Sequence, residues 1–249
     1  RNQNRKPDYI LVVDNGSNDG TQEFLQRNTE MLRCCLLSEN LGFGAGLATG
    51  IKFALQNFEF DYLWLMDDDS FPNKEVLSSL LDNSIKINLS GILGLSGFKL
   101  IYGIPRTIKS DDLIESVDFV LVDNALLSKS AVVGAGNFRE DLFMMCEDYE
   151  YCIRLRNMGF FVGVLNDLKI SVDRKHLGSQ PNSLNLVWRG YYHARNHFLI
   201  LKLNFSLKNL IFYFLRQSKF IVHSLFFGKY RWQRTFFRIK GIWDGLNGV

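Results

Sequence analysis

The 249-residue sequence lacks the features of an unfolded, fibrous or membrane-spanning chain. It contains only 4 Pro, and no pattern recurs with a period of about 20 to 50 residues, which excludes collagen-like, low-complexity and solenoid architectures. No stretch of about 18 uninterrupted apolar residues occurs, so we expect no transmembrane helix. With 47% apolar and 22% charged residues, the chain has the composition of one large folded domain or of a domain with an appendage.

Cysteine is also scarce, and its spacing is not that of a disulfide scaffold. The chain has 4 Cys and no CxxC pair, so we expect buried, reduced thiols and a reducing compartment. The opening segment RNQNRKPD has no apolar stretch and therefore does not have the pattern of a signal peptide. Both observations favour a cytoplasmic protein.

Acidic side chains are almost absent from the end of the chain. Residues 186–249 hold 11 Lys and Arg and one acid, Asp244, together with 16 of the 34 aromatic residues. We therefore expect an N-terminal domain over residues 1–183 and a basic, aromatic helical extension over residues 184–249. Three helices are predicted in this extension, at about 184–203, 206–227 and 229–245.

The second of these helices is amphipathic and basic. Lys208, Arg216, Lys219 and His223 fall within one arc of a helical projection and leave a broad apolar face. This pattern predicts a helix that lies at an anionic membrane surface, here the inner face of the cell membrane, without crossing it. Packing in a helical bundle or a homo-oligomer is the alternative. A nucleic-acid-binding module is a third possibility, but the acidic remainder of the chain argues against a nucleic-acid partner.

The first third of the chain alternates short apolar runs with helical periodicity. This alternation is typical of βα units, so we expect an α/β fold with a mostly parallel sheet flanked by helices. Further along the chain, Pro72 suits the first turn of a helix. Strands are predicted at Tyr9–Val13, Arg33–Leu37, Tyr62–Met66, 91–101, 117–122, Phe160–Leu165 and Leu168–Val172, and a helix at Glu147–Met158.

Three consecutive acids, Asp67, Asp68 and Asp69, follow the strand at Tyr62–Met66 directly. Their mutual repulsion costs about a kcal/mol per pair even in water, which indicates that a positive group lies nearby. Because ligands of α/β sheets bind at the carboxyl ends of strands, Asp67 and Asp69 are candidate ligands of a divalent cation. The alternative is a solvated acidic turn that caps the next helix.

Glu147 and Asp148 stand at the start of a predicted helix. The helix dipole keeps a carboxylate at this position ionised and ready to accept a proton, although two acids at a helix start also serve as simple caps. Glu150 and Arg154 are spaced for a surface ion pair.

A glycine-rich segment, NLGFGAG, precedes another predicted helix. Its spacing does not match the dinucleotide-binding pattern GxGxxG. We therefore expect residues 40–46 to form a loop of close backbone approach at a helix N-terminus, facing a phosphate or a sugar.

Five segments occur in an order that resembles the family 2 glycosyltransferases of the GT-A fold. These segments are VVDNGSNDGT, NLGFGAGLATG, WLMDDDSFP, GNFREDLFMMCEDYEYCIRLRNMGF and HLG. Within that family, the pattern is similar to the rhamnosyl- and galactofuranosyltransferases that build bacterial surface polysaccharides such as O antigen. The resemblance spans about residues 8–200.

The resemblance implies an inverting, metal-dependent transfer of a sugar from a UDP- or dTDP-linked donor to a glycan or lipid-linked acceptor. It implies that Asp148 is the catalytic base. The remaining implied roles are donor contacts for Asp14, Asn15, Ser17, Asn40, Gly42, Gly44 and Asp68, and Mn²⁺ or Mg²⁺ ligation by Asp67, Asp69 and His176.

Two departures from the family pattern stand out. Family members carry a strand and a helix ahead of the VVDNGS segment, so we expect the family's first strand to be missing here. A truncated, non-catalytic scaffold is the corresponding alternative to an enzyme. In the glycine-rich loop, Phe43 stands where the family often has glycine.

Overall fold

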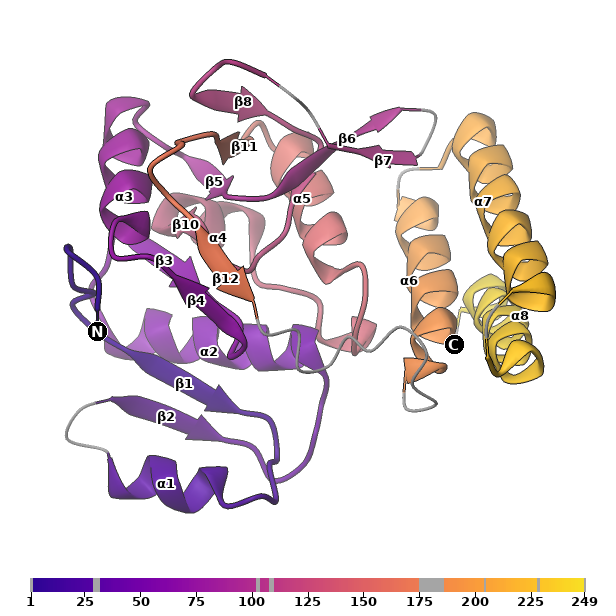
Figure 1. Ribbon diagram of the computed structural model, residues 1–249, viewed down its shortest axis with the longest axis horizontal. Coiled ribbons are helices and arrows are strands. Elements are labelled where there is room, and N and C mark those ends of the chain that lie inside the picture. Colours follow the sequence, from indigo (N-terminus) through magenta and orange to yellow (C-terminus); the bar gives the residue numbers. More distant parts are fainter. Residues whose placement is uncertain are drawn as a thin grey trace. The chain divides into compact units, whose positions relative to one another are not determined.

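The computed structural model describes residues 2–28, 32–101, 104–107, 110–174, 186–203, 205–227 and 229–248 (Figure 1). The chain divides into two compact units. The N-terminal unit comprises Arg1–Lys99, Thr107–Phe143 and Glu147–Lys175, and the C-terminal unit comprises Leu100–Arg106, Met144–Cys146 and His176–Val249.

The N-terminal unit begins with a small two-stranded sheet. Strands β1 (Leu11–Asp14) and β2 (Arg33–Leu36) pair in parallel, and helix α1 (Thr21–Arg27) connects them. Helix α2 (Phe43–Asn57) packs on β1 through a face of small and branched residues that includes Ala48, Ile51 and Ala54. Figure 1 shows α1 and α2 on either side of this pair of strands. The predicted βα order of this region is confirmed.

A five-stranded sheet in the order β3-β10-β5-β11-β8 forms the centre of the unit. Strands β3, β5 and β11 run in one direction, whereas β10 and β8 run in the opposite direction. The expectation of a mostly parallel sheet is therefore wrong for β10 and β8. The bounds are β3 (Tyr62–Leu65), β5 (Gly91–Gly94), β8 (Ile114–Ser116), β10 (Ala125–Ser128) and β11 (Phe161–Leu165).

The region after the acidic turn differs from its prediction. Pro72 ends a strand, β4 (Ser70–Pro72), which pairs with β12 (Val172–Arg174), and helix α3 (Val76–Lys86) begins only at Val76. The Asn73 NH donates to the Ser171 carbonyl and continues the strand-like pairing beyond Pro72. Helix α3 contributes Val76, Leu77 and Leu80 to the core, where they pack with Leu93, Leu126 and Leu165 of the central sheet.

The remaining elements of this unit include the helix that begins with Glu147 and Asp148. Strand β6 (Gly97–Ile101) pairs antiparallel with β9 (Phe119–Val120), and helix α5 (Glu147–Asn157) lies near β9 and β11. The expected ion pair on α5 is present, with 2.8 Å between Arg154 Nη2 and Glu150 Oε2, but Glu150 is buried, so the pair is not at the surface as predicted. Of the four cysteines only Cys152 is buried, which corrects the expectation that all are. The other elements of this unit are α4 (Lys129–Ala135) and the short 3-10 helix η1 (Glu140–Leu142), whereas β7 (Ile104–Arg106) belongs to the C-terminal unit.

The C-terminal unit contains the three predicted helices, α6 (Arg189–Leu203), α7 (Leu207–Phe226) and α8 (Arg231–Asn247). Glycine allows α6 and α8 to pack with their backbones close together. A Cβ atom at Gly241 would lie 2.2 Å from the Tyr191 carbonyl oxygen, so no other residue fits there without a shift. Phe198, Leu201 and Tyr213 form a small core. No helix in the described part of the chain is long and apolar enough to cross a membrane.

Candidate active site

Asp14 occupies the carboxyl end of β1, where the turn DNGSNDGT begins. Its carboxylate Oδ2 accepts hydrogen bonds from the Ser17 NH at 3.0 Å and from Gln22 Nε2 at 2.7 Å. Burial opposes ionisation of this group, but the hydrogen bonds from Ser17 and Gln22 outweigh it and hold the pKa of Asp14 below its usual value. Asp14 is therefore a buried, ionised acceptor in a rigid turn.

Asn15 ties this turn to the glycine-rich loop. Its amide Nδ2 donates to the Gly42 carbonyl at 2.8 Å, and its Oδ1 accepts from the Leu41 NH at 2.9 Å. Within the loop, Asn40 Oδ1 accepts from the Gly42 NH at 2.9 Å. The structure thus brings Asp14, Asn15, Asn40 and Gly42 together, although they come from two segments of the chain.

The glycines of the loop have a packing role. A Cβ atom at Gly42 would lie 2.1 Å from the Phe143 carbonyl oxygen, and one at Gly44 would lie 2.6 Å from the Arg139 carbonyl oxygen. The Phe43 NH donates to the Phe143 carbonyl. The N-terminus of α2 is therefore held against residues 139–143, just ahead of the Glu147-Asp148 pair, and this packing is a sufficient reason for glycine at both positions.

Glu147 and Asp148 begin α5 in an environment that favours protonation. Burial raises the pKa of Glu147 to about 8, and the charges of Asp148 and Asp67 add to the rise. Glu147 Oε2 is buried and accepts no hydrogen bond from the described residues. The carboxyl group of Asp148 is enclosed although the residue as a whole is only partly buried, and burial raises the pKa of Asp148 to about 6. Its Oδ1 accepts from the Tyr149 NH at 2.7 Å, which opposes part of that rise.

The acidic turn after β3 is held by a residue that the sequence did not single out. Asp123, which is buried, accepts hydrogen bonds from the Asp67 NH at 3.2 Å and from the Ser70 hydroxyl at 2.6 Å. Asn124 Nδ2 also donates to Asp123, at 2.8 Å. The only signal in the sequence is an acid placed between two apolar strand segments, FVLV and ALL, where a charge needs partners.

The three acids of the turn differ in exposure. Asp67 and Asp69 are partly buried, whereas Asp68 is exposed. The charge of Asp67 makes a small contribution to the raised pKa of Glu147. Among the described residues, no group of three His, Cys, Asp or Glu side chains is arranged to hold a metal ion. His176, the third expected ligand, lies outside the described residues.

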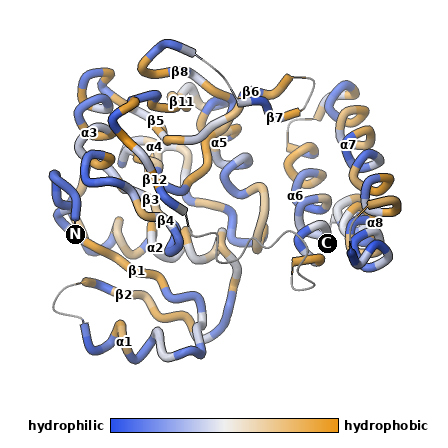
Figure 2. The backbone as a smooth tube through the Cα atoms, viewed as in Figure 1, coloured by the Kyte–Doolittle hydropathy of each residue, from blue (hydrophilic) through white to orange (hydrophobic). Residues whose placement is uncertain are grey.

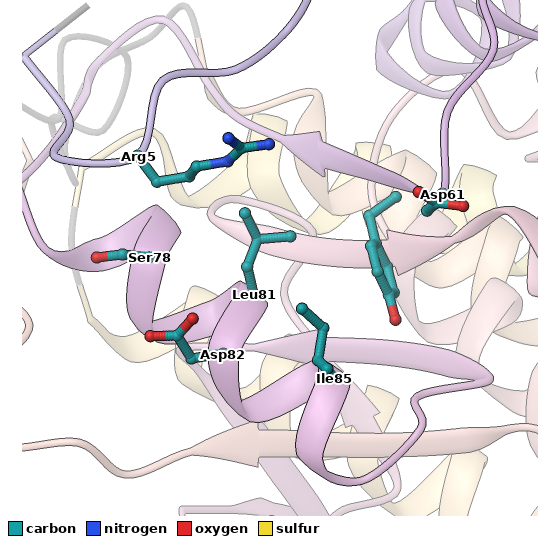
Figure 3. A pocket seen from close by; sticks show the side chains of 7 residues that line it. Arg5, Asp61, Ser78, Leu81, Asp82 and Ile85 are labelled. Carbon is teal, nitrogen blue, oxygen red and sulfur yellow. The ribbon is translucent and has the colours of Figure 1, made fainter.

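A separate pocket of about 280 Å³ lies elsewhere on the N-terminal unit (Figure 3). Its lining comes from the segment before β1, the start of β3 and the side of α3, and it includes none of the acids described above. The lining residues are Arg5, Asp61, Tyr62, Ser78, Leu81, Asp82 and Ile85.

The sequence is similar to known sugar transferases. Residues 1–97 match the model of the family described as Glycosyl transferase family 2. The dTDP-rhamnosyl transferase RfbF of Shigella flexneri is 23% identical over 97% of this chain and 87% of its own length. The galactofuranosyltransferase GlfT1 of Mycolicibacterium smegmatis is 38% identical over 32% of this chain and 26% of its own length.

The fold is also similar to that of a solved sugar transferase. The mannosyltransferase PcManGT from Pyrobaculum calidifontis, solved in complex with GDP-Man and Mn²⁺, superposes with a TM-score of 0.58 at 13% identity, over 98% of this chain and 80% of that one. The chain thus has the GT-A fold of this glycosyltransferase. These matches support a family 2 glycosyltransferase that resembles rhamnosyl- and galactofuranosyltransferases.

Proposed function

We propose that the enzyme transfers a sugar from a UDP- or dTDP-linked donor to a growing bacterial surface glycan or its lipid-linked precursor, with inversion at the anomeric carbon. Rhamnose and galactofuranose are the favoured sugars, since they occur in the names of the two similar enzymes. The proposal depends above all on the position of Asp148, an enclosed carboxyl group next to Glu147, whose raised pKa includes a small contribution from the charge of Asp67.

Asp148 is proposed as the general base. The acceptor hydroxyl oxygen attacks the anomeric carbon, the bond from that carbon to the diphosphate oxygen breaks, and the hydroxyl proton moves to the Asp148 carboxylate. With a pKa of about 6, Asp148 is mostly ionised at neutral pH and is still basic enough to accept the proton. A single displacement of this kind requires no nucleophile from the enzyme.

The acid cluster suits a hard divalent cation such as Mn²⁺ or Mg²⁺. Carboxylate oxygens are the ligands that these ions prefer, and the hydrogen-bonding capacity of Glu147 Oε2 is unused among the described residues. Asp67 and Asp69, with His176, would hold the ion. When bound, it would neutralise the negative charge that develops on the departing diphosphate.

The donor nucleotide is proposed to bind beside the turn after β1. Asp14 and Asn15 offer fixed acceptors and donors to the base or the ribose, with Ser17 and Asn40 adjacent. Gly42 and Gly44 would shape the loop that faces the donor, and the exposed Asp68 would contact the donor ribose or sugar.

A donor panel tests this function. UDP-galactofuranose, dTDP-rhamnose, UDP-glucose and UDP-galactose would each be incubated with the enzyme and Mn²⁺, and transfer or slow hydrolysis would be measured. We expect turnover of dTDP-rhamnose or UDP-galactofuranose, and its loss when Mn²⁺ is chelated. Turnover of the two hexopyranose donors alone, or turnover that is unaffected by chelation, would contradict the proposal.

The C-terminal unit is proposed to lie on the cytoplasmic, anionic face of the cell membrane. Helices α7 and α8 carry large apolar side chains that remain exposed, among them Phe226 (69%), Trp232 (76%) and Trp243 (67%). Figure 2 shows hydrophobic positions interleaved with hydrophilic ones along both helices. Exposed lysines at Lys208 and Lys219 accompany them. Aromatic residues and lysines that are both exposed suit an interface of headgroups and acyl chains. The competing occupant of this face is a second copy of the chain.

A further inference from the structure

The interior of the C-terminal unit contains polar residues where a helical bundle usually has apolar ones. Gln217 of α7 is only 1% exposed and Thr235 of α8 is 8% exposed. Arg238 of α8 reaches into the same region, where its Nη1 donates to Gln217 Oε1 at 2.8 Å and lies 3.4 Å from His193 Nδ1 of α6. All three helices therefore contribute to one polar cluster.

Two arginines flank a single aromatic ring in this cluster. The guanidinium carbon of Arg238 lies 4.3 Å from the centroid of the Phe220 ring, and that of Arg216 lies 5.9 Å from the same centroid. The His193 ring stands 5.5 Å from Phe220 as well. Both arginines are partly exposed, so the cluster is reachable from solvent.

Hydrogen-bond donors outnumber acceptors in the cluster. Gln217 Nε2 and Thr235 Oγ1 are buried and have no hydrogen-bond partner among the described residues. No carboxylate in the described ranges forms an ion pair with Arg238. Asp244, the single acid of residues 186–249, accepts instead from the Tyr191 hydroxyl at 2.9 Å. Among the described residues, the partly buried Arg238 therefore has no anionic acceptor, and the buried Gln217 Nε2 has no acceptor at all.

The electrostatics of the cluster also favour the binding of an anion. Burial, together with the smaller effect of the neighbouring Arg216 charge, lowers the pKa of Arg238 to about 10. Burial and then the charges of Arg216 and Arg238 lower the pKa of His193 well below its usual value, so this ring stays neutral. Positive charge is thus concentrated at a place where an anion would relieve the repulsion.

We propose that Arg216, Gln217 and Arg238 form a binding site for a phosphate group in the C-terminal unit. The planar guanidinium of Arg238 can bind two phosphate oxygens, and the free NH of Gln217 can donate to a third oxygen. Free phosphate in solution and the phosphate group of a lipid share this chemistry. This site is independent of the proposed transfer reaction.

The first test is thermal unfolding of the full chain with inorganic phosphate or pyrophosphate, in EDTA and at ionic strength matched with NaCl. We expect phosphate to raise the Tm of the wild type, and the doubly substituted Arg216→Gln, Arg238→Gln chain to lose that response. The matched control, Lys208→Gln with Lys219→Gln, removes the same charge from exposed positions of α7 and should retain it.

Gln217→Glu provides a sharper variant that does not remove a side chain. The new carboxylate can pair with Arg238 in place of the bound anion, so we expect an unchanged or higher Tm in NaCl and at least a tenfold weaker response to phosphate. This variant keeps the test decisive if the arginine variant does not fold. Turnover of nucleotide sugar with a soluble acceptor should stay within about twofold of the wild type in all variants.

Vesicles distinguish the two sources of phosphate. If the site takes a lipid phosphate, cosedimentation with phosphatidylcholine vesicles containing phosphatidylglycerol will fall more in the arginine variant than in the lysine control, and free phosphate will compete weakly. If it takes free phosphate, only the Tm response will differ. The proposal is wrong if neither assay separates the arginine variant from the lysine control, and the cluster is then a polar packing element.

Discussion

The carboxylate of Asp123 accepts a 2.6 Å hydrogen bond from the hydroxyl of Ser70, across 53 positions of the chain. The same carboxylate accepts from the Asp67 NH, so one buried acid holds both ends of the acidic turn. The turn is thereby fixed relative to the central sheet, and the orientation of its carboxylates depends on a residue that does not belong to it.

Replacement of Asp123 by alanine should disturb both the fold and the donor site. The change leaves the Asp67 NH and the Ser70 hydroxyl without their acceptor, which costs about 1 to 3 kcal/mol for each buried group. Urea unfolding should show the loss of stability, and calorimetry should show weaker Mn²⁺-dependent nucleotide binding. Ser70→Ala, which removes one donor only, should be milder. Unchanged nucleotide binding in Asp123→Ala would show that the turn does not need this support.

The Asp148→Asn variant should fold and bind donor but transfer little sugar. An amide has nearly the volume of the carboxylate but cannot accept the acceptor proton, and general base catalysis contributes about 10² to 10⁴-fold. Steady-state transfer and calorimetric donor binding would be measured together. Glu147→Gln should be milder. A transfer rate above about a tenth of the wild type in Asp148→Asn would show that another group is the base.

The activity should depend on pH through Asp148. Because burial raises the pKa of Asp148 to about 6, the carboxyl group is protonated and inactive as a base below that pH. The value of kcat/KM should therefore fall about tenfold per pH unit below pH 6 and level off above it. A pH profile with saturating Mn²⁺ measures this. An acid limb near pH 4, the range of an exposed Asp, would show that the carboxyl group is not enclosed during catalysis.

Asp69→Asn should weaken metal-dependent binding of the nucleotide. The substitution removes one negative charge and one strong oxygen ligand from the proposed Mn²⁺ site, while the turn stays anchored through Asp67 and Ser70. Calorimetric titration with UDP or dTDP, with and without Mn²⁺, should show a loss confined to the titration with metal. Equal affinities for wild type and variant would remove Asp69 from the metal site.

Association with membranes should depend on charge. Vesicle cosedimentation should rise with phosphatidylglycerol content and fall with added salt, because attraction between exposed lysines and headgroups is screened by ions. Lys208→Glu with Lys219→Glu should weaken it and spare transfer to a soluble acceptor. If the wild type ignores such vesicles at low salt and forms a dimer that these substitutions leave intact, the exposed face of α7 and α8 is a protein interface.

Local patterns in the sequence were sufficient for most helices and strands and for the two acidic motifs. The alternation of strand and helix over β1, α1, β2 and α2, and the three helices from Arg189 onward, follow from periodicity and turn residues, which act over a few positions. The order of the motifs was enough to indicate the family. The shift of α3 from Pro72 to Val76 shows the limit, because the pairing of β4 with a strand about a hundred residues later overrides the helix-start preference of proline.

Only the tertiary structure decided which groups meet. Three features join segments that are far apart in sequence. They are the antiparallel pairing of β10 and β8 with their neighbours, the close approach of Gly42 to Phe143 and the hydrogen bond between Asp123 and Ser70. The polar interior beneath α7 was also decided by tertiary packing. The spacing of apolar residues in the α7 sequence does not reveal that Tyr213 and Gln217 are buried while Phe214 and Leu215 remain exposed. A hydrogen bond or a close backbone approach forms wherever packing brings complementary atoms together. A pattern of neighbouring residues in the sequence does not identify which distant residue supplies those atoms.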